Sequence, residues 1–328
     1  MPSLHHSSDR DPGITREPSG NDFRYLYPDR TTVSRGEDLD RIAQLVIPPA
    51  YQDVWICLSP QGHLQATGRD AKSRKQYRYH PDWRKQRQLK KFNRLAEFGQ
   101  HLPSLRRKIR AALKGEDGER QRALAIALRL MDKEGLRVGS EIYLESNGTR
   151  GASTLGKKNI EFVEPGHLAL HFTAKGGRKV DIDLNDRLLD QALQRCHELP
   201  GQRLLSYHGD DGEIYDVDSG KLNHYLKSLC DEHFSVKDLR TWRASASCVE
   251  QLLRTSERDP EKAYLEAVKF AAKAIRNRYT TCRKYYIHPA IITQIDRVGI
   301  EALQKANINA ISEMTTSEAH LLSWLEND

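Results

Sequence analysis

The chain has 328 residues, of which 38% are hydrophobic and 30% charged, and its net charge is +7. This length predicts about two domains, each large enough to have its own core. A continuous run of about 18 apolar residues, the minimum for a membrane-spanning helix, does not occur. Five scattered cysteines without a C-x-x-C pair argue against a zinc site and a disulfide framework. We therefore expect a protein of the reducing cytoplasm that needs no metal and no other cofactor.

Positive charge is concentrated in two segments. Residues 69–94 hold 11 basic and 2 acidic residues, which leaves 41 basic against 43 acidic residues in the rest of the chain. Residues 267–288 contain six further Lys and Arg and no acid. Such clustering favours a polyanion partner, because phosphate contacts gain affinity from counterion release. A solvated basic helix face is the alternative that charge alone leaves open.

The N-terminal part of the chain is predicted to be rich in β-strands. Residues 1–20 are polar and contain several Pro, Gly and Ser residues, so we expect a disordered tail. From residue 21 to about 90, short apolar or alternating runs predict strands, with one short helix near residues 39–45. These features predict a small β-rich domain over residues 21–90.

Helical periodicity dominates from Asp82 onward, and the second domain is expected over residues 91–328. It has one β interruption, in which two alternating runs flank Gly176-Gly177 and predict a hairpin with Lys175 at its tip. Residues 159–163 can add a third strand. Asp218 or Ser219 is expected to cap the helix that follows. Further helices are predicted at residues 119–134, 238–254, 260–276, 290–308 and 316–326.

One segment alternates basic and aromatic side chains, from Lys72 to Tyr79. Cations can hold phosphates there, while Gln76 and the tyrosines can reach base edges or stack on sugars. The alternative is an edge strand that Lys and Arg protect from aggregation. The interleaving of tyrosines with cations favours DNA binding.

Four other segments carry candidate catalytic residues, although each of these residues could instead have a purely structural role. Arg137, in Leu136-Arg137-Val138-Gly139, could be a salt-bridged residue at a helix end, and Lys175 could be an ordinary solvent-exposed lysine on a hairpin. Arg240, in Lys237-Asp238-Leu239-Arg240-Thr241, could pair with a neighbouring carboxylate. Tyr285-Tyr286, followed by Ile287-His288-Pro289, could belong to the core.

Taken together, the ordered Arg, Lys, Arg and Tyr motifs resemble the type IB DNA topoisomerases, in particular their bacterial and poxvirus branch. The resemblance extends from about residue 22 to about residue 292. It implies an α+β protein, in which a small β-rich N-terminal domain and a larger, mainly α-helical catalytic domain with a β-hairpin insertion form a C-shaped clamp around duplex DNA. It also implies relaxation of supercoiled DNA by transient single-strand cleavage through a 3′-phosphotyrosyl intermediate, without ATP or metal.

The resemblance implies Tyr286 as nucleophile, Arg137 and Arg240 as phosphate clamps, Lys175 as general acid and Asn277 as a neutral third donor. Tyr285 competes for the role of nucleophile, although the Ile-His-Pro that follows favours Tyr286. The residues expected to contact DNA are Arg69, Lys72, Arg74, Lys75, Gln76, Tyr77, Tyr79, Lys90, Lys91, Lys157, Lys158, Lys237, Arg283 and Lys284.

Two alternatives remain open at this point. A tyrosine recombinase shares the same chemistry, but it usually has His-x-x-Arg where this chain has Lys237 three residues before Arg240. A non-catalytic DNA-binding protein is the other. For either enzyme class the partner is duplex DNA. We expect a monomer associated with the nucleoid and not with a membrane.

Overall fold

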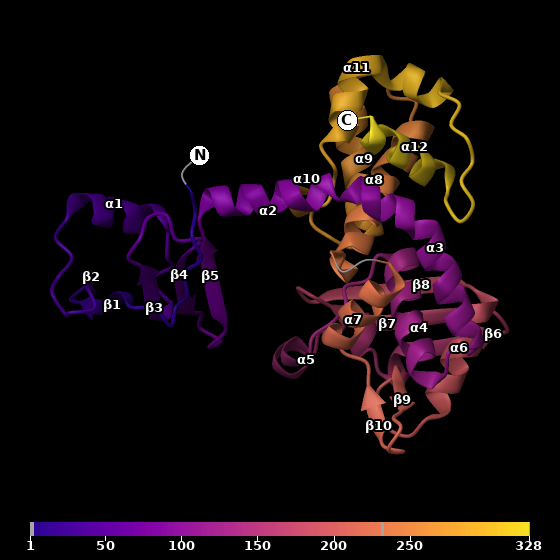
Figure 1. Ribbon diagram of the computed structural model, residues 1–328, viewed down its shortest axis with the longest axis horizontal. Helices are drawn as coiled ribbons and strands as arrows, with labels where there is room; N and C mark the ends of the chain where they lie inside the picture. The colour runs from indigo at the N-terminus through magenta and orange to yellow at the C-terminus, as the bar shows by residue number, and fades with distance from the viewer. Residues whose placement is uncertain (1–2, 231–232, 328) are drawn as a thin grey trace. The chain divides into compact units, whose positions relative to one another are not determined.

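The computed structural model describes residues 3–230 and 233–327. The chain forms two compact units, residues 1–91 and 92–328 (Figure 1), where the sequence placed the boundary between residues 90 and 91. The protein is of the α+β class that the sequence predicted. No helix in the described part of the chain is long and apolar enough to cross a bilayer.

The first unit contains a five-stranded antiparallel sheet with the strand order β2-β1-β3-β4-β5. Its core is small and includes Ile14, Val54 and Ile56 from the sheet and Ile42 from the single short helix, as the sequence predicted for residues 39–45. The elements are β1 (Gly13–Ser19), β2 (Asp22–Leu26), α1 (Gly36–Gln44), β3 (Gln52–Cys57), β4 (Leu64–Arg69) and β5 (Lys75–Tyr79).

The prediction of a disordered tail over residues 1–20 is wrong for most of that segment. Strand β1 lies between β2 and β3, and Ile14 is fully buried. Closer to the N-terminus, His5 forms a bridge to Gly62, and the Asp11 carbonyl accepts a hydrogen bond from Trp55 Nε1 at 2.9 Å. Backbone hydrogen bonds hold a strand in its sheet, so a polar segment with a single buried apolar side chain can form one. Residues 1 and 2 lie outside the described part of the chain.

The second unit is mainly helical. Helix α2 (Pro81–Asn93) leads into it, and α8 packs against α4, α9, α11 and α12. The α-helices of this unit are α3 (Leu95–Lys114), α4 (Glu119–Glu134), α5 (Glu141–Asn147), α6 (Arg187–Glu198), α7 (Ser219–Leu229), α8 (Val236–Arg254), α9 (Pro260–Ala274), α10 (Tyr279–Tyr285), α11 (Ala290–Lys305) and α12 (Thr316–Glu326). The helices predicted at residues 119–134 and 316–326 have these bounds, and three others end within a few residues of the predicted positions.

The predicted hairpin is confirmed, with a third strand beside it. Strands β6 (Ile160–Glu164), β7 (His167–Ala174) and β8 (Arg178–Asn185) form an antiparallel sheet, and Ala174 pairs with Arg178 on either side of the turn at residues 175–177. Both turn glycines have positive φ, at 84° and 74°, a conformation that glycine adopts without strain. Lys175 therefore lies at the exposed tip. A short second hairpin, β9 (Ser206–His208) and β10 (Ile214–Asp216), was not predicted.

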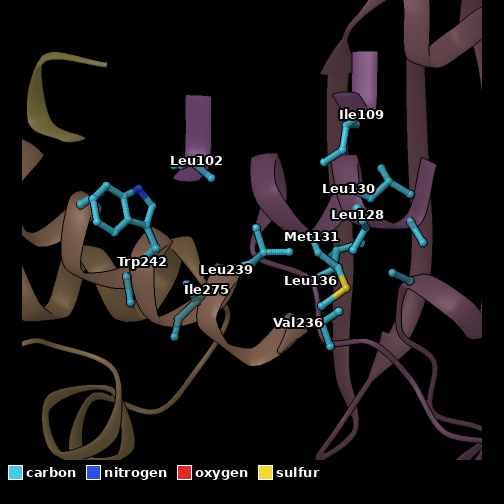
Figure 2. Packing of buried hydrophobic residues seen from close by; sticks show 14 of the residues in the cluster. Leu102, Ile109, Leu128, Leu130, Met131, Leu136, Val236, Leu239, Trp242 and Ile275 are labelled. Atoms are coloured by element: carbon cyan, nitrogen blue, oxygen red, sulfur yellow. The ribbon is translucent and has the colours of Figure 1, made fainter. Parts of the chain in front are cut away.

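A single apolar core holds the second unit together, and it reaches the segments that carry the candidate catalytic residues. Figure 2 shows Met131, Leu136 and Val236 close together, where α4 ends and α8 begins. Leu136 directly precedes Arg137, and Val236 begins the helix that carries Arg240. The packing of these apolar side chains therefore determines where the two arginines lie.

A buried ion cluster ties α12 to this core. Arg106 on α3 makes two hydrogen bonds to Asp132 on α4, at 2.8 and 2.9 Å, and two to Glu318 on α12, at 2.7 and 2.9 Å. Trp242 on α8 donates from its indole nitrogen to Glu318 at 2.9 Å. Burial on its own would raise the pKa of the Glu318 carboxyl, but the hydrogen bonds and charge of Arg106 outweigh it and hold that pKa below its usual range. The cluster thus links four helices, α3, α4, α8 and α12.

We expect Glu318→Gln to lower the free energy of unfolding by about 3 kcal/mol, because it leaves part of the Arg106 charge buried and unpaired. The melting temperature should fall by about 6–12 °C. A lowered pKa stabilises the fold above the unfolded pKa, near 4.3, and this contribution is lost as pH falls through the folded pKa. The difference from wild type should therefore shrink below about pH 4. Thermal unfolding across pH measures this, with exposed Glu326→Gln on the same helix as the control; equal effects of both variants would contradict it.

Candidate active site

Arg137 is positioned by two segments that pack backbone to backbone. Its carbonyl accepts a hydrogen bond from the Ala152 amide at 2.8 Å, and the Val138 carbonyl accepts one from the Ser153 amide at 2.7 Å. A Cβ on Gly151 would lie 2.4 Å from the Arg137 carbonyl oxygen, so glycine is required for this approach. The Leu136–Gly139 motif, which contains Arg137, and the Gly151–Leu155 segment therefore form one structural block.

Arg240 lies in the first turns of α8, and its guanidinium bridges two other chain segments. It donates to the Gly135 carbonyl after α4 and to the Ile275 carbonyl after α9, the latter at 3.0 Å. The start of α8 is itself held by Asp238, whose two carboxylate oxygens accept hydrogen bonds from Arg94 at 2.8 and 3.0 Å. Arg240 is 4% exposed, and its Nε has no hydrogen-bond partner in the described part of the chain.

Tyr286 directly follows α10 and is attached to α8 through its backbone. Its carbonyl accepts a hydrogen bond from Ser245 Oγ at 3.0 Å, and the same Ser245 oxygen accepts one from the His288 amide at 3.1 Å. The Arg240 guanidinium lies 5.5 Å from the centroid of the Tyr286 ring. This backbone anchoring places the phenol beside the arginine, with which it forms a side-chain hydrogen bond.

These side chains line one cavity of about 400 Å³ within the second unit. Arg137, Lys175, Lys237, Arg240 and Tyr286, all expected from the sequence, lie on its wall. Tyr285 does not; it is 39% exposed, and the Lys284 ammonium lies 5.5 Å from its ring centroid. The described lining includes no Asp, Glu, His or Cys.

Neither arginine has a carboxylate beside it among the described residues that line the cavity. Burial lowers the pKa of Arg240, the charge of Arg137 lowers it further, and Tyr286 acts in the opposite direction. Burial also lowers the pKa of Arg137, and Arg178 adds to that effect while Tyr286 opposes it. Two positive charges that are desolvated and close to each other favour an anion between them. The cavity therefore has the properties of a binding site for a phosphate group.

Lys175 reaches the cavity from the hairpin tip. It is exposed, and its ammonium lies 5.3 Å from the ring centroid of Tyr143 on α5, in cation–π geometry. Such a contact at an exposed site contributes about 0.5–1 kcal/mol, so it does not hold the lysine firmly.

Asn277 does not line the cavity. Its side-chain oxygen accepts a hydrogen bond from the Arg278 amide at 2.9 Å, which turns the carboxamide toward its own chain. The neighbouring Arg276 carbonyl accepts a hydrogen bond from Arg137 at 3.3 Å, so the backbone at this point is close to the first arginine.

The basic–aromatic segment of the first unit presents two different faces. Tyr77 and Tyr79 are 47% and 36% exposed, and their rings stack with centroids 6.1 Å apart. Gln76 lies on the opposite face of β5, where it donates to Asp70 at 2.9 Å, and Arg74 pairs with the same carboxylate. Arg74 lowers the pKa of Asp70 to about 2.

The remaining residues expected to contact DNA are distributed over both units. Lys72, Lys90, Lys158, Lys237, Arg283 and Lys284 are exposed. Arg69 and Lys75 are exposed as well, although each has an acidic neighbour, Asp53 and Asp9 respectively. Lys91 is half-buried, and half-buried Lys157 donates to the Leu199 carbonyl.

Sequence patterns missed several residues of the cavity wall, namely Ser140, Tyr143, Thr149 and Arg150. Arg150 donates to the Thr154 carbonyl at 2.6 Å, and its own amide bonds to the Thr173 carbonyl at 2.8 Å, which fastens this segment to the hairpin. In the sequence, Arg150 directly precedes the Gly151–Leu155 segment, and this position could have indicated that it belongs to the site.

Two protein-family models match this chain. The catalytic core of eukaryotic DNA topoisomerase I matches residues 80–314, and the N-terminal domain of bacterial DNA topoisomerase IB matches residues 22–70. The DNA topoisomerase 1B of Acanthamoeba polyphaga mimivirus is 30% identical over 286 residues, which cover 84% of this chain and 85% of the viral protein. DNA topoisomerase 1 beta of Arabidopsis thaliana is 27% identical over 201 residues, 60% of this chain but 21% of the plant protein.

The cavity has the basic lining and the tyrosine that suit an enzyme acting on a phosphate group. The chain belongs to the type IB DNA topoisomerase family. The resemblance drawn from the Arg, Lys, Arg and Tyr motifs is thereby confirmed, and the family is not that of the tyrosine recombinases.

Proposed function

We propose that this topoisomerase relaxes supercoiled duplex DNA by cutting and resealing one strand through a 3′-phosphotyrosyl bond to Tyr286. The observation that carries the proposal is the cavity in which Tyr286 shares a wall with Arg137, Arg240 and Lys175, whereas Tyr285 lies outside it. Duplex DNA is the substrate that this family membership implies. A monomer is sufficient, because one chain supplies all of these groups.

The arrangement suits a transesterification at phosphorus. The Tyr286 oxygen attacks the phosphorus atom and releases its proton to solvent, the bond to the 5′-oxygen breaks, and that oxygen leaves as a hydroxyl after receiving a proton. One phosphodiester is exchanged for another of similar energy, so the reverse reaction reseals the strand and no ATP is required. Charge that builds on the non-bridging oxygens is met by Arg137 and Arg240, with Asn277 as a further donor after its carboxamide rotates.

Lys175 is the group that we assign as general acid for the 5′-oxygen. It carries its ammonium on the tip of a hairpin, and its contact with Tyr143 is weak enough to be given up when a phosphate enters.

We expect Lys175→Ala to slow cleavage by about 10²–10⁴-fold on an ordinary phosphodiester. On a substrate with a 5′-bridging sulfur the loss should be less than about tenfold, because a thiolate leaves without a proton. Single-turnover cleavage of both substrates measures this. Lys179→Ala, on the same hairpin but away from the cavity, is the matched control. Equal slowing on both substrates would remove Lys175 from this role.

Binding of the duplex is assigned to both units. In the first unit the stacked Tyr77 and Tyr79 face solvent beside Lys75, a pattern that suits contacts to bases and phosphates. In the second unit Lys237 lies on the cavity wall, and Arg283 and Lys284 flank the tyrosine.

The direct test is relaxation of a plasmid that lacks any recombination site, in EDTA and without ATP. We expect supercoils of both signs to be removed. Failure to relax the plasmid at every salt concentration would overturn the proposed function, and a strict requirement for paired sites would indicate recombination instead.

A further inference from the structure

A second cavity lies in the catalytic unit and shares no described residue with the active-site cavity. Its volume is about 300 Å³. Its walls come from the start of α4, the end of α6 and the first residue of β9 (Figure 1 shows these elements). Nothing in the proposed relaxation reaction uses it.

Two polar groups of this wall are buried without a hydrogen-bond partner in the described part of the chain. They are the Oγ of Ser206, a residue that is 1% exposed, and the Nε of Arg122. Buried donors are almost always satisfied in folded proteins, and an unsatisfied one costs free energy. Two such groups in one cavity would both be satisfied by a ligand with acceptor oxygens.

The charges around the cavity favour an anion. Neither Arg122 nor Arg195 forms a salt bridge with a described residue, although the charge of Arg122 contributes to lowering the pKa of Glu119. Of the two acids on the wall, Glu119 is engaged by His208, which donates from its amide at 3.1 Å and lies 2.9 Å away through Nδ1. Exposed Glu198 is the acid that remains.

Two further features of the wall are compatible with an anion. No side chain caps the N-terminus of α4, so its first-turn amides add positive potential. Burial raises the pKa of the Cys196 thiol to about 11, and this neutral thiol therefore does not repel an anion.

We propose that this cavity binds a phosphate group, held by the guanidiniums of Arg122 and Arg195 and by the hydroxyl of Ser206. Arginine forks match the geometry of phosphate oxygens, and the serine supplies a neutral donor. A free phosphate anion and a backbone phosphate of a second DNA segment present the same chemistry.

The first arm of the test measures binding of pyrophosphate by calorimetry. All variants are made in an Arg240→Gln background, which weakens anion binding at the active site. We expect saturable binding, an increase in Kd of about tenfold or more for Arg122→Gln, and about threefold or more for Ser206→Ala. Exposed Arg120→Gln, on the same helix but outside the cavity, should leave Kd within about twofold.

Ser206→Ala removes an unsatisfied hydroxyl and should not lower the melting temperature of the ligand-free protein, so it remains informative if Arg122→Gln folds poorly.

The second arm uses a duplex and the cleavage-deficient Tyr286→Phe protein. If the phosphate belongs to DNA, Arg122→Gln should weaken duplex binding and reduce the salt slope by about 0.9. If it is a free anion, duplex binding should be unchanged and pyrophosphate binding alone should respond. The proposal is overturned if neither ligand responds to Arg122→Gln or to Ser206→Ala.

Discussion

Tyr286→Phe should abolish the covalent attachment of the protein to DNA while leaving duplex binding nearly unchanged. Removing a covalent nucleophile typically costs about 10⁵–10⁶-fold in rate. The backbone contacts from Ser245 hold residue 286 in place without the hydroxyl, so the change should not displace the chain. The measurement is single-turnover formation of a protein–DNA adduct on a substrate whose cut strand diffuses away.

Tyr285→Phe is the matched control, because the two tyrosines are adjacent and only Tyr286 lines the cavity. Its adduct yield and rate should stay within about twofold of wild type, as for a surface substitution. Mass spectrometry of the wild-type adduct should find the modification on Tyr286. An adduct that persists in Tyr286→Phe and disappears in Tyr285→Phe would move the nucleophile by one residue.

The sequence predicted those parts of the fold that local patterns determine. The β7–β8 hairpin was predictable because two alternating runs flank Gly176-Gly177, and α4 because its apolar residues recur at helical spacing. Strand β1 was not predictable, since backbone pairing holds it and Ile14 is its single apolar anchor. The prediction of disorder rested on side-chain composition, which does not detect a strand that is held mainly by its backbone.

The candidate site was predictable as a set of residues but not as a geometry. The Arg, Lys, Arg and Tyr motifs named four of the side chains on the cavity wall. Sequence could not show that the carboxamide of Asn277 turns toward Arg278, or that Gln76 donates to Asp70. It also could not show that Tyr143 on α5 and Arg150 after it enter the wall, because no periodic pattern covers α5 or the segment between α5 and the sheet. Such details depend on long-range packing, which local patterns do not encode.

Arg240→Lys should slow cleavage by about 10³-fold or more, although it keeps the charge. The guanidinium donates to the carbonyls after α4 and after α9 and still faces the cavity, an arrangement that needs a planar group with several donors. A lysine offers a single ammonium and cannot satisfy both carbonyls while it contacts a phosphate. Single-turnover cleavage gives the rate, and Arg243→Lys on the same helix, outside this cavity, is the control.

Loss of charge stabilisation can be separated from a general disturbance of the fold by the choice of substrate. Replacing one non-bridging oxygen of the scissile phosphate by a methyl group removes the negative charge that Arg240 is proposed to meet. On this neutral substrate Arg240→Lys should be slower than wild type by less than about tenfold, because little charge is left to stabilise. A misfolded site would be slow on both substrates. Equal losses on the charged and the neutral substrate would therefore mean that Arg240 acts by holding the ends of α4 and α9 together and not by stabilising the transition state.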